Sequence, residues 1–390
     1  MATFKDATVE GLNTLVRRWN HGNAFRKCGT HGGCFWMAGN LFHTAVESMR
    51  RTKLQKDTYG IGKEALAYFD ESIPDTTNPR EWRHKYRFWV DDYGWWGIAF
   101  CHAYLASDQL RYGPSMKKKF ALYAKNSWEA LNACWAHKRI TWKKGRKSYT
   151  ITGGIPNTSA DATLAGRNCV TNECYWRLSG LLGETFGQHY LDPKANANKF
   201  FLQAKTQGIL FDGSGLVYER FLGFPNTDHP EWTWVGDQGL FAASCYFNRQ
   251  GTSGVFDWKQ ATDSVKAVQA NKKTASGVLH EDLAPYSEYT LDYACGKGTF
   301  MRCLAYINDD LHRALPGGAQ YDPYISLNAK ALWKNRRRGI LPYYWDAESS
   351  EPKLESWGGY RQDTANAVLH AAGLNALSAA LPWLQDHSID

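Results

Sequence analysis

Two adjacent aspartates, Asp91 and Asp92, lie in the segment FWVDDYGWWGIAF at residues 88–100. Two carboxylates in a cleft are the minimum that glycoside hydrolysis requires. One must be ionised to stabilise or attack an oxocarbenium-like centre, while the other gives a proton to the leaving oxygen. Mutual repulsion and apolar walls disfavour ionisation, so we expect one of the two carboxyl groups to have a raised pKa. Neighbouring side chains that leave a turn can lie about 5–6 Å apart, the separation found in retaining enzymes.

Aromatic residues surround this pair, and the chain as a whole holds 17 tryptophans and 21 tyrosines. Such a composition fits either a large aromatic core or a cleft lined with flat apolar faces on which sugars stack. We expect Phe88 and Trp89 to anchor the turn, and Tyr93, Trp95 and Trp96 to shape a sugar-binding site.

Helical periodicity recurs along the whole chain, whereas strand patterns are scarce. One set of segments is apolar on a single face, which is typical of surface helices. We expect these near residues 8–18, 61–73, 116–135, 194–208, 256–271 and 321–336. A second set is apolar nearly all round and must be enclosed by other helices. These inner segments start near residues 36, 92, 172, 238, 297 and 361.

The two sets alternate with a loose period of about 55–80 residues, which indicates an internal repeat of one helical hairpin. Six hairpins closed into a ring form an (α/α)6 barrel. We therefore expect an all-α chain with a single (α/α)6 domain over residues 1–390. An irregular helical bundle in two domains is the alternative.

Polar and aromatic residues cluster where the inner segments start. The clusters are Trp36 with Asn40, Asp91 with Asp92, Asn172 with Glu173, Asp237 with Gln238, Lys297, and Ser356 to Gly359 with Trp357. In a ring of hairpins all of these starts open at the same end, so the clusters would converge on one bowl. Helix N-termini carry unpaired N–H groups and partial positive charge, which suit oxygen-rich ligands. Simple N-capping explains one residue per helix, but not the pairs.

Composition limits the classes of partner. With 43% hydrophobic and 22% charged residues the chain is typical of a folded soluble protein, and no apolar run is long enough to span a membrane. The net charge of +8 is scattered, apart from KKK at 117–119, KKGRK at 143–147 and RRR at 336–338. No nucleic-acid signature accompanies these runs, so we expect no nucleic-acid partner. The first and last are interpreted as solvated faces.

Metal and cofactor motifs are absent from the sequence. The nine cysteines show no metal spacing, the histidines are dispersed, and there is no GxSxG, HExxH, P-loop or GxGxxG motif. We expect neither a metal nor a cofactor. Five cysteines fall in apolar helical segments and are expected to act as small hydrophobes, namely Cys101, Cys169, Cys174, Cys245 and Cys303. Cys28 and Cys34 could form a local disulfide.

Taken in order, the motifs resemble glycoside hydrolase family 76, the endo-α-1,6-mannanases and related fungal cell-wall proteins. DDYGWWGIAF is similar to the family's DD-x-x-WW motif. Further similar motifs contain Gly153 and Gly154 before Ile155, Asn168 with Thr171 and Asn172, Gln238 with Gly239, Lys297 to Leu304, Trp36 with Asn40, and SWGG with Trp357. The match runs from about residue 10 to residue 380 and is most specific at the two aspartates.

The resemblance implies an (α/α)6 fold and retaining hydrolysis of α-1,6-mannosidic bonds, with Asp91 as nucleophile and Asp92 as general acid/base. Together with the clusters at the inner-helix starts, it gives the candidate substrate contacts, which are Trp36, Asn40, Tyr93, Trp95, Trp96, Gly153, Gly154, Asn172, Asp237, Gln238, Lys297 and Trp357.

The sequence departs from the family pattern in three places. Pro156 and Asn157 follow the Gly-Gly-Ile motif where the family has aromatic residues. Asp237 adds an acid where a neutral residue is usual. The basic run KKGRK precedes the glycine loop and could face a negatively charged substrate, although an exposed loop without a ligand is the preferred interpretation. These departures bear on the glycan more than on the reaction.

Three functions follow as hypotheses. The first is a retaining hydrolase acting on an α-mannan-like polysaccharide or oligosaccharide. The second is a cell-wall transglycosidase with the same intermediate, and the third is a non-catalytic glycan-binding protein. We expect a monomer in an extracellular or periplasmic location, with any leader already absent from this chain. The sequon at Asn157 lies in the expected substrate loop, so we expect it to stay unmodified.

Overall fold

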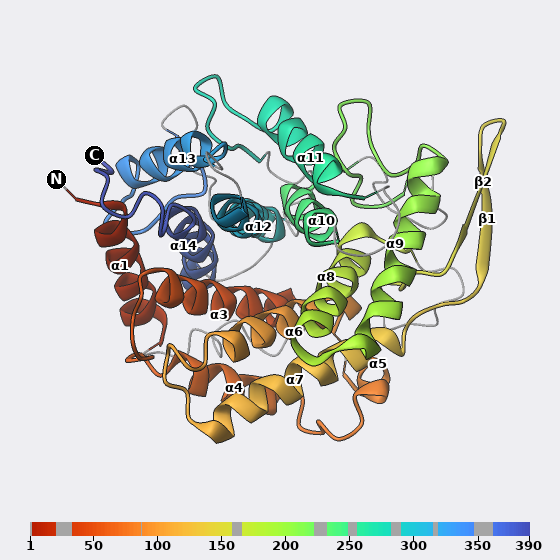
Figure 1. Ribbon diagram of the computed structural model, residues 1–390, viewed down its shortest axis with the longest axis horizontal. Helices are drawn as coiled ribbons and strands as arrows, with labels where there is room; N and C mark the ends of the chain where they lie inside the picture. The colour runs from red at the N-terminus through yellow and green to blue at the C-terminus, as the bar shows by residue number, and fades with distance from the viewer. Residues whose placement is uncertain are drawn as a thin grey trace.

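The computed structural model describes residues 2–20, 33–86, 88–157, 166–221, 232–248, 256–281, 290–314, 319–346 and 362–390. Two concentric rings of helices dominate it (Figure 1). The inner ring contains α3 (Gly33–Arg51), α6 (Val90–Leu105), α8 (Cys169–Phe186), α10 (Val235–Phe247), α12 (Thr290–Ala314) and α14 (Gln362–Ala379). The outer ring contains α1 (Phe4–Leu15), α4 (Ile61–Ser72), α7 (Pro114–Asn132), α9 (Leu191–Thr206), α11 (Trp258–Asn271) and α13 (Asp322–Lys334).

The inner ring is closed. Each inner helix packs on the next along the chain, and α14 packs on α3. Helix α1 packs against α14, so the two ends of the chain together form the sixth hairpin, and Thr3 and Ser388 form a β-bridge there. The prediction of an (α/α)6 barrel is therefore confirmed. That a single domain spans residues 1–390 stays a prediction.

The surface helices lie close to the predicted ranges, and five of the six inner helices begin within a few residues of their predicted starts. The exception is α12, which begins at Thr290 rather than near residue 297. Lys297 was taken as the polar start of this helix, but it lies two turns inside and is buried. The acid that stands in the first turn of α12 is Asp292.

Side-chain pattern explains which ring each helix joins. In α7 the buried residues Phe120, Tyr123, Ser127 and Leu131 recur every three or four positions, whereas the lysines at 117–119 face away from the core. Helix α6 is buried nearly all round. Its Gly94 lies against α8, where an added Cβ would come within 2.6 Å of Cys174 Cβ. This close contact fixes the position of the helix that carries the two aspartates.

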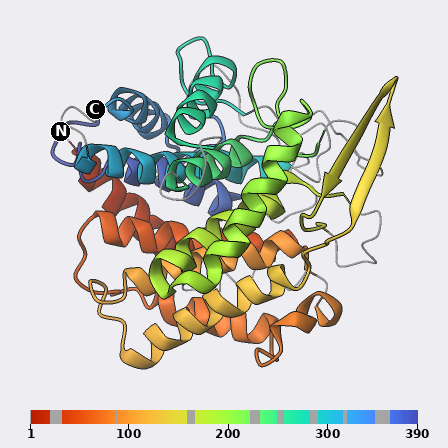
Figure 2. The ribbon, with the colours of Figure 1, turned by 45° about the vertical axis from the view of Figure 1, so that its right-hand side comes forward.

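A β-hairpin that was not predicted projects from the barrel, at the right of Figures 1 and 2. Strands β1 (Arg139–Lys144) and β2 (Lys147–Thr152) pair antiparallel, with Trp142 opposite Tyr149. The basic run at 143–147 forms the exposed tip of this hairpin. The remaining short elements are α5 (Trp82–Lys85), a π-helical turn (Val16–Asn20) and 3₁₀ turns at Pro79–Glu81 and Gln188–Tyr190.

The cysteines of the apolar segments agree with their predicted role. Cys101, Cys169, Cys174, Cys245 and Cys303 are buried free thiols. Cys28 and Cys34 lie outside the residues whose side chains the structure describes. In the described part of the chain, no helix has the length and apolar character needed to cross a membrane.

Candidate active site

The first turns of five inner helices surround a cavity of ≈ 150 Å³. Its walls combine carboxylates, amides, one guanidinium group and several aromatic rings. The lining residues are Trp36, Trp89, Asp91, Asp92, Trp95, Asn157, Asn168, Val170, Glu219, Arg220, Trp232, Trp234, Asp292 and Tyr293. The convergence of inner-helix starts on one site therefore holds for α3, α6, α8, α10 and α12.

Asp91 and Asp92 lie in the first turn of α6, which begins after Trp89. Both side chains line the cavity, so they share one space despite being sequence neighbours. Asp92 is only 1% exposed, and neither of its carboxylate oxygens has a hydrogen-bond partner among the described residues. The positive end of the α6 dipole partly offsets the cost of placing two acids here.

Burial separates the protonation behaviour of the two acids. Burial raises the pKa of Asp91 to about 7, with a hydrogen bond from Trp95 opposing the rise and the charge of Glu219 adding to it. Burial raises the pKa of Asp92 well above its usual range, and repulsion from Asp91 adds to the effect. Near neutral pH the proton is therefore held on Asp92 while Asp91 can ionise. This is the division that a proton donor and a nucleophile require.

Two further carboxylates line the cavity and were not among the predicted site residues. Glu219 lies in the loop before α10, and Asp292 lies in the first turn of α12. Burial raises the pKa of both, and their negative charges each disfavour ionisation of nearby acids. Asp292 carries the same signal as Asp91, an acid at an inner-helix start, and was missed because that start was placed near residue 297. Glu219 follows no periodic pattern that the sequence could reveal.

Tryptophans form the apolar part of the wall. The rings of Trp36, Trp95 and Trp234 lie 5.6 to 6.2 Å apart and contact one another in tilted or edge-on geometry. Trp89 is 52% exposed and lines the cavity, so the expectation that it anchors the turn is wrong. Phe88 does anchor it, because its ring stacks on Phe35 at 4.0 Å.

Tyr93 and Trp96 do not line the cavity. Both are completely buried, because they lie on the faces of α6 that pack against other helices. Trp96 Nε1 donates to the Phe35 carbonyl at 2.8 Å, and the Tyr93 ring packs against Trp82. These contacts hold α6 in place.

Two predicted contact residues, Asn172 and Gln238, bind backbone instead of facing the cavity. Asn172 accepts from Ile155 N at 2.8 Å and donates to Ile155 O at 3.0 Å. Gln238 does the same with Val217, at 2.8 and 2.9 Å. Each amide thus fixes a loop two residues before a cavity residue, Asn157 in one case and Glu219 in the other.

The glycine pair also supports a loop. Gly153 and Gly154 have φ angles of +87° and +85°, which side-chain-bearing residues rarely adopt. An added Cβ at Gly154 would lie 2.3 Å from the Phe200 ring. The two glycines therefore let the chain leave β2 and pass close to α9 before it reaches Ile155, which is hydrogen-bonded to Asn172.

Three further candidates, Asn40, Lys297 and Asp237, are not among the residues that line the cavity. Asn40 accepts from Arg302 Nη2 at 2.5 Å, and Lys297 donates to the Tyr343 carbonyl. Asp237 is fully buried, and its oxygens have no hydrogen-bond partner among the described residues. Burial raises its pKa well above the usual range, and the charge of Glu173 adds to this. Trp357 lies outside the described residues.

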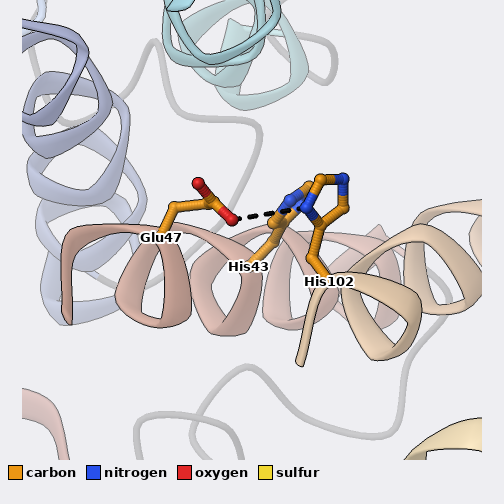
Figure 3. A group of neighbouring side chains, drawn as sticks. All are labelled: His43, Glu47 and His102. Carbon is orange, nitrogen blue, oxygen red and sulfur yellow. Dashed lines mark ion pairs between the residues drawn. The ribbon is translucent and has the colours of Figure 1, made fainter. Parts of the chain in front are cut away.

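One group of side chains in the described part of the chain has the spacing of metal ligands, and it lies away from this cavity. His43, Glu47 and His102 bring their ligand atoms within 4.8 Å of one another (Figure 3). Glu47 stands eleven residues after Trp36 on α3, which is about 16 Å along the helix.

The fold and the cavity together define an (α/α)6 barrel with an acidic, aromatic-walled site at the starts of its inner helices. The sequence matches no protein-family model and no curated protein. Solved structures do match it. An inactive variant of the α-1,6-mannanase GH76A of Salegentibacter sp. HEL1_6, in complex with α-1,6-mannotetrose, aligns with a TM-score of 0.69 and 17% identity over 97% of this chain and 99% of that chain.

Two other structures extend the likeness. The GH76 α-mannanase BT2949 of Bacteroides thetaiotaomicron aligns with a TM-score of 0.61 and 16% identity, over 96% of each chain. Dfg5 from Chaetomium thermophilum, in complex with glucosamine, aligns with a TM-score of 0.63 and 16% identity, over 89% of this chain and 81% of that chain. The chain thus has the fold of glycoside hydrolase family 76 enzymes, as the motifs implied.

Proposed function

We propose that the protein is a retaining glycosidase that cleaves α-1,6-mannosidic or closely related α-glycosidic bonds. The observation that carries the proposal is that Asp91 and Asp92 open into one aromatic-walled cavity, with burial keeping the proton on Asp92. Asp91 is the nucleophile and Asp92 the general acid/base.

The reaction requires a protonated Asp92 and an ionised Asp91. Asp92 gives its proton to the glycosidic oxygen while the Asp91 carboxylate attacks the anomeric carbon, which breaks the glycosidic bond and leaves a glycosyl ester on Asp91. Asp92, now ionised, takes a proton from the incoming water, and the ester is hydrolysed with net retention. Both acids are desolvated, so each charge acts more strongly on the reacting centre than it would in water.

The structural neighbours support this assignment. The Salegentibacter mannanase was made inactive by replacing two adjacent aspartates with alanine, and it was captured with an α-1,6-linked mannose oligomer. An adjacent aspartate pair in the same fold gives the present chain the corresponding equipment. We also propose that it acts as a monomer on an extracellular or periplasmic glycan, as the family resemblance suggests.

The test uses Asp91→Asn and Asp92→Asn on a panel of α-mannans, α-1,6-mannooligosaccharides and α-glucans. Each variant should lose about a thousandfold or more in kcat/KM, which corresponds to about 4 kcal/mol of barrier. Asp108→Asn is the matched control. Asp108 is an exposed acid in the turn after α6, at the opposite end of this helix from Asp91, and it forms an ion pair with Lys117. NMR of the first-formed product should show the α-anomer.

Full activity in both variants, or a β-anomer as first product, would overturn the assignment. Glycan binding by calorimetry without turnover across the whole panel would identify a non-catalytic glycan-binding protein instead.

Transfer to a second sugar is the alternative function, favoured by the exposed face of Trp89 at the cavity. An acceptor sugar stacked there would replace water in the second step. Product sizing with an added oligosaccharide acceptor separates the two functions. Longer products indicate a transglycosidase, and transfer to water alone indicates a hydrolase.

A further inference from the structure

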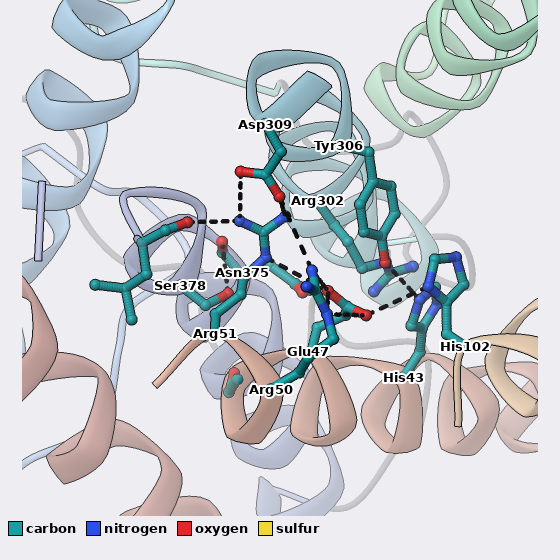
Figure 4. Close-up of polar contacts among 12 residues, drawn as sticks. His43, Glu47, Arg50, Arg51, His102, Arg302, Tyr306, Asp309, Asn375 and Ser378 are labelled. Carbon is teal, nitrogen blue, oxygen red and sulfur yellow. Dashed lines mark hydrogen bonds and ion pairs between the residues drawn. The ribbon is translucent and has the colours of Figure 1, made fainter. Parts of the chain in front are cut away.

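A second pocket, of ≈ 280 Å³, lies at the opposite end of the barrel, where α3, α6 and α10 end. Its lining residues are Glu47, Arg50, His102, Leu105, Arg177, Phe247, Tyr306, Asp309 and Arg313. The side chains from α3, α6 and α12 point toward one another around it (Figure 4). Nothing in the proposed glycosidase mechanism uses this pocket.

The acids of the pocket are already paired. Arg50 donates through Nε and Nη2 to both oxygens of Glu47, at 2.8 to 3.2 Å. Arg51 Nη2 donates to Asp309 at 2.7 Å, and its Nη1 donates to the Leu381 carbonyl at 2.6 Å. Burial alone would raise the pKa of Glu47, but Arg50, His102 and Arg51 outweigh it and hold the pKa well below the usual range. Both arginines therefore have partners within the protein.

Arg177 differs from them. It is only 6% exposed and lines the pocket, yet its guanidinium has no hydrogen bond or ion pair among the described residues. Its contact is with the Phe247 ring, whose centroid lies 4.4 Å from Arg177 Cζ. Stacking of this kind holds the guanidinium plane in a fixed orientation and leaves its N–H groups available.

His102 supplies a complementary group. Its Nδ1 lies 3.3 Å from Glu47 Oε1, so the ring proton belongs on Nδ1, where it can be donated to the carboxylate. Nε2 is then an acceptor, and it is buried without a hydrogen-bond partner among the described residues. The pocket thus offers donors from Arg177 and an acceptor from His102.

Electrostatics decides against a cation. Arg50, Arg177 and Arg313 line the pocket together with Glu47 and Asp309, and Arg51 contacts both of these acids. Four guanidinium groups and two carboxylates leave an excess of two positive charges. A divalent ion on His43, Glu47 and His102 would raise this excess to four in a largely buried space. An anion would reduce it.

We propose that this pocket binds inorganic phosphate in a form that carries at least one proton. Arg177 donates to two of the phosphate oxygens, and the phosphate hydroxyl donates to His102 Nε2. The acceptor on His102 gives selectivity, because inorganic phosphate retains a proton near neutral pH. Sulfate does not, and a phosphate monoester, with a second pKa of about 6, largely does not.

The test is calorimetry on the full chain at constant ionic strength, with inorganic phosphate, glucose 6-phosphate, sulfate and Zn²⁺ as separate ligands. Inorganic phosphate should bind, and sulfate and the ester should each bind at least about tenfold more weakly because they lack the donated hydrogen bond. An ester that binds as tightly as inorganic phosphate would overturn the role given to His102. This comparison uses the unmodified protein, so it does not depend on whether a variant folds.

Arg177→Met should weaken phosphate binding by about ten- to a hundredfold, the loss expected for a charged hydrogen-bonding partner. Arg336→Met is the matched control, because Arg336 also stacks on an aromatic ring, that of Trp333, but lies elsewhere. Glycosidase activity should persist in both variants, so the two proposals fail independently. Equal affinity for phosphate and sulfate, an unaffected Arg177→Met variant, or binding of Zn²⁺ without phosphate would each overturn the proposal.

Discussion

The two ends of the inner ring are built from the same helices but treat charge in opposite ways. Where the helices begin, Asp92 and Asp237 are buried, with no hydrogen-bond partner for either carboxylate among the described residues. Where they end, Glu47 and Asp309 are buried in direct contact with Arg50 and Arg51. The acids at the starting end suit the positive ends of the helix dipoles, and Arg50 and Arg51 in the last turn of α3 suit the negative end.

The helix dipole does not explain why the buried acids at the helix starts lack hydrogen-bond partners among the described residues. An unpaired buried carboxylate costs stability, whereas a well-paired one costs little as long as both partners remain. We infer that the starting end is arranged for reaction at the expense of stability, and that the terminal end holds the barrel together.

The largest expected effect is on stability at the terminal end. Arg51→Met leaves the buried Asp309 carboxylate without its main partner and should lower the free energy of unfolding by about 3–5 kcal/mol. Urea unfolding at pH 7 measures this loss in the free energy of unfolding. At the other end, Asp237→Asn replaces a buried acid that has no hydrogen-bond partner among the described residues with a neutral group of similar shape, so it should leave stability unchanged or higher. The contrast fails if both variants lose the same amount.

A smaller effect should appear in the pH dependence of stability, with opposite signs at the two ends. Asp91 has a folded-state pKa of about 7, above its unfolded value of 3.8, so its contribution falls as pH rises between these values. Glu47 has a folded-state pKa below its ordinary 4.5, so its contribution is present above pH 4.5 and is lost as pH falls through the folded-state value.

Urea unfolding from pH 3.5 to pH 8 tests this pair of signs. Asp91→Asn should flatten the decline between about pH 4 and pH 7, and Glu47→Gln should flatten the loss below about pH 4.5. Identical pH profiles for the two variants would show that the ends do not differ in this respect.

The smallest expected effect concerns the cavity wall. Trp89→Ala removes an exposed stacking face and should raise KM about fivefold, equivalent to about 1 kcal/mol, with stability unchanged. Trp258→Ala on the outer helix α11 is the matched control, since Trp258 is similarly exposed at 59% but lies away from the cavity. An equal change in KM in both variants would show that Trp89 does not contact the substrate.

The fold was predictable because one-sided and all-round apolar patterns alternate, and that alternation alone defines two rings of helices. The aspartate pair was predictable because acids among tryptophans do not suit a core. The hairpin β1–β2 was not, because lysine and arginine fill half of β1 and obscure its alternation.

The substrate contacts were predicted less well, for a physical reason. An amide at a helix start can bind a sugar or a peptide group equally well, and only the structure shows that Asn172 and Gln238 bind Ile155 and Val217. Glu219 lines the cavity from a loop, and a loop has no periodic pattern from which the orientation of a side chain can be predicted. The signal for Asp292 was present in the sequence but was assigned to the wrong turn of the helix.

The paired amide contacts have a consequence for how this cavity could be redesigned. Each loop is held by an inner-helix amide, and each is also bonded to the start of α8, through Thr171 Oγ1 to Asn157 Oδ1 and through Cys169 N to the Glu219 carbonyl. The walls near Asn157 and Glu219 therefore share one support, and an exchange of either segment has to keep these bonds. New glycan preferences could be introduced by grafting those two segments while Asp91 and Asp92 stay where α6 holds them.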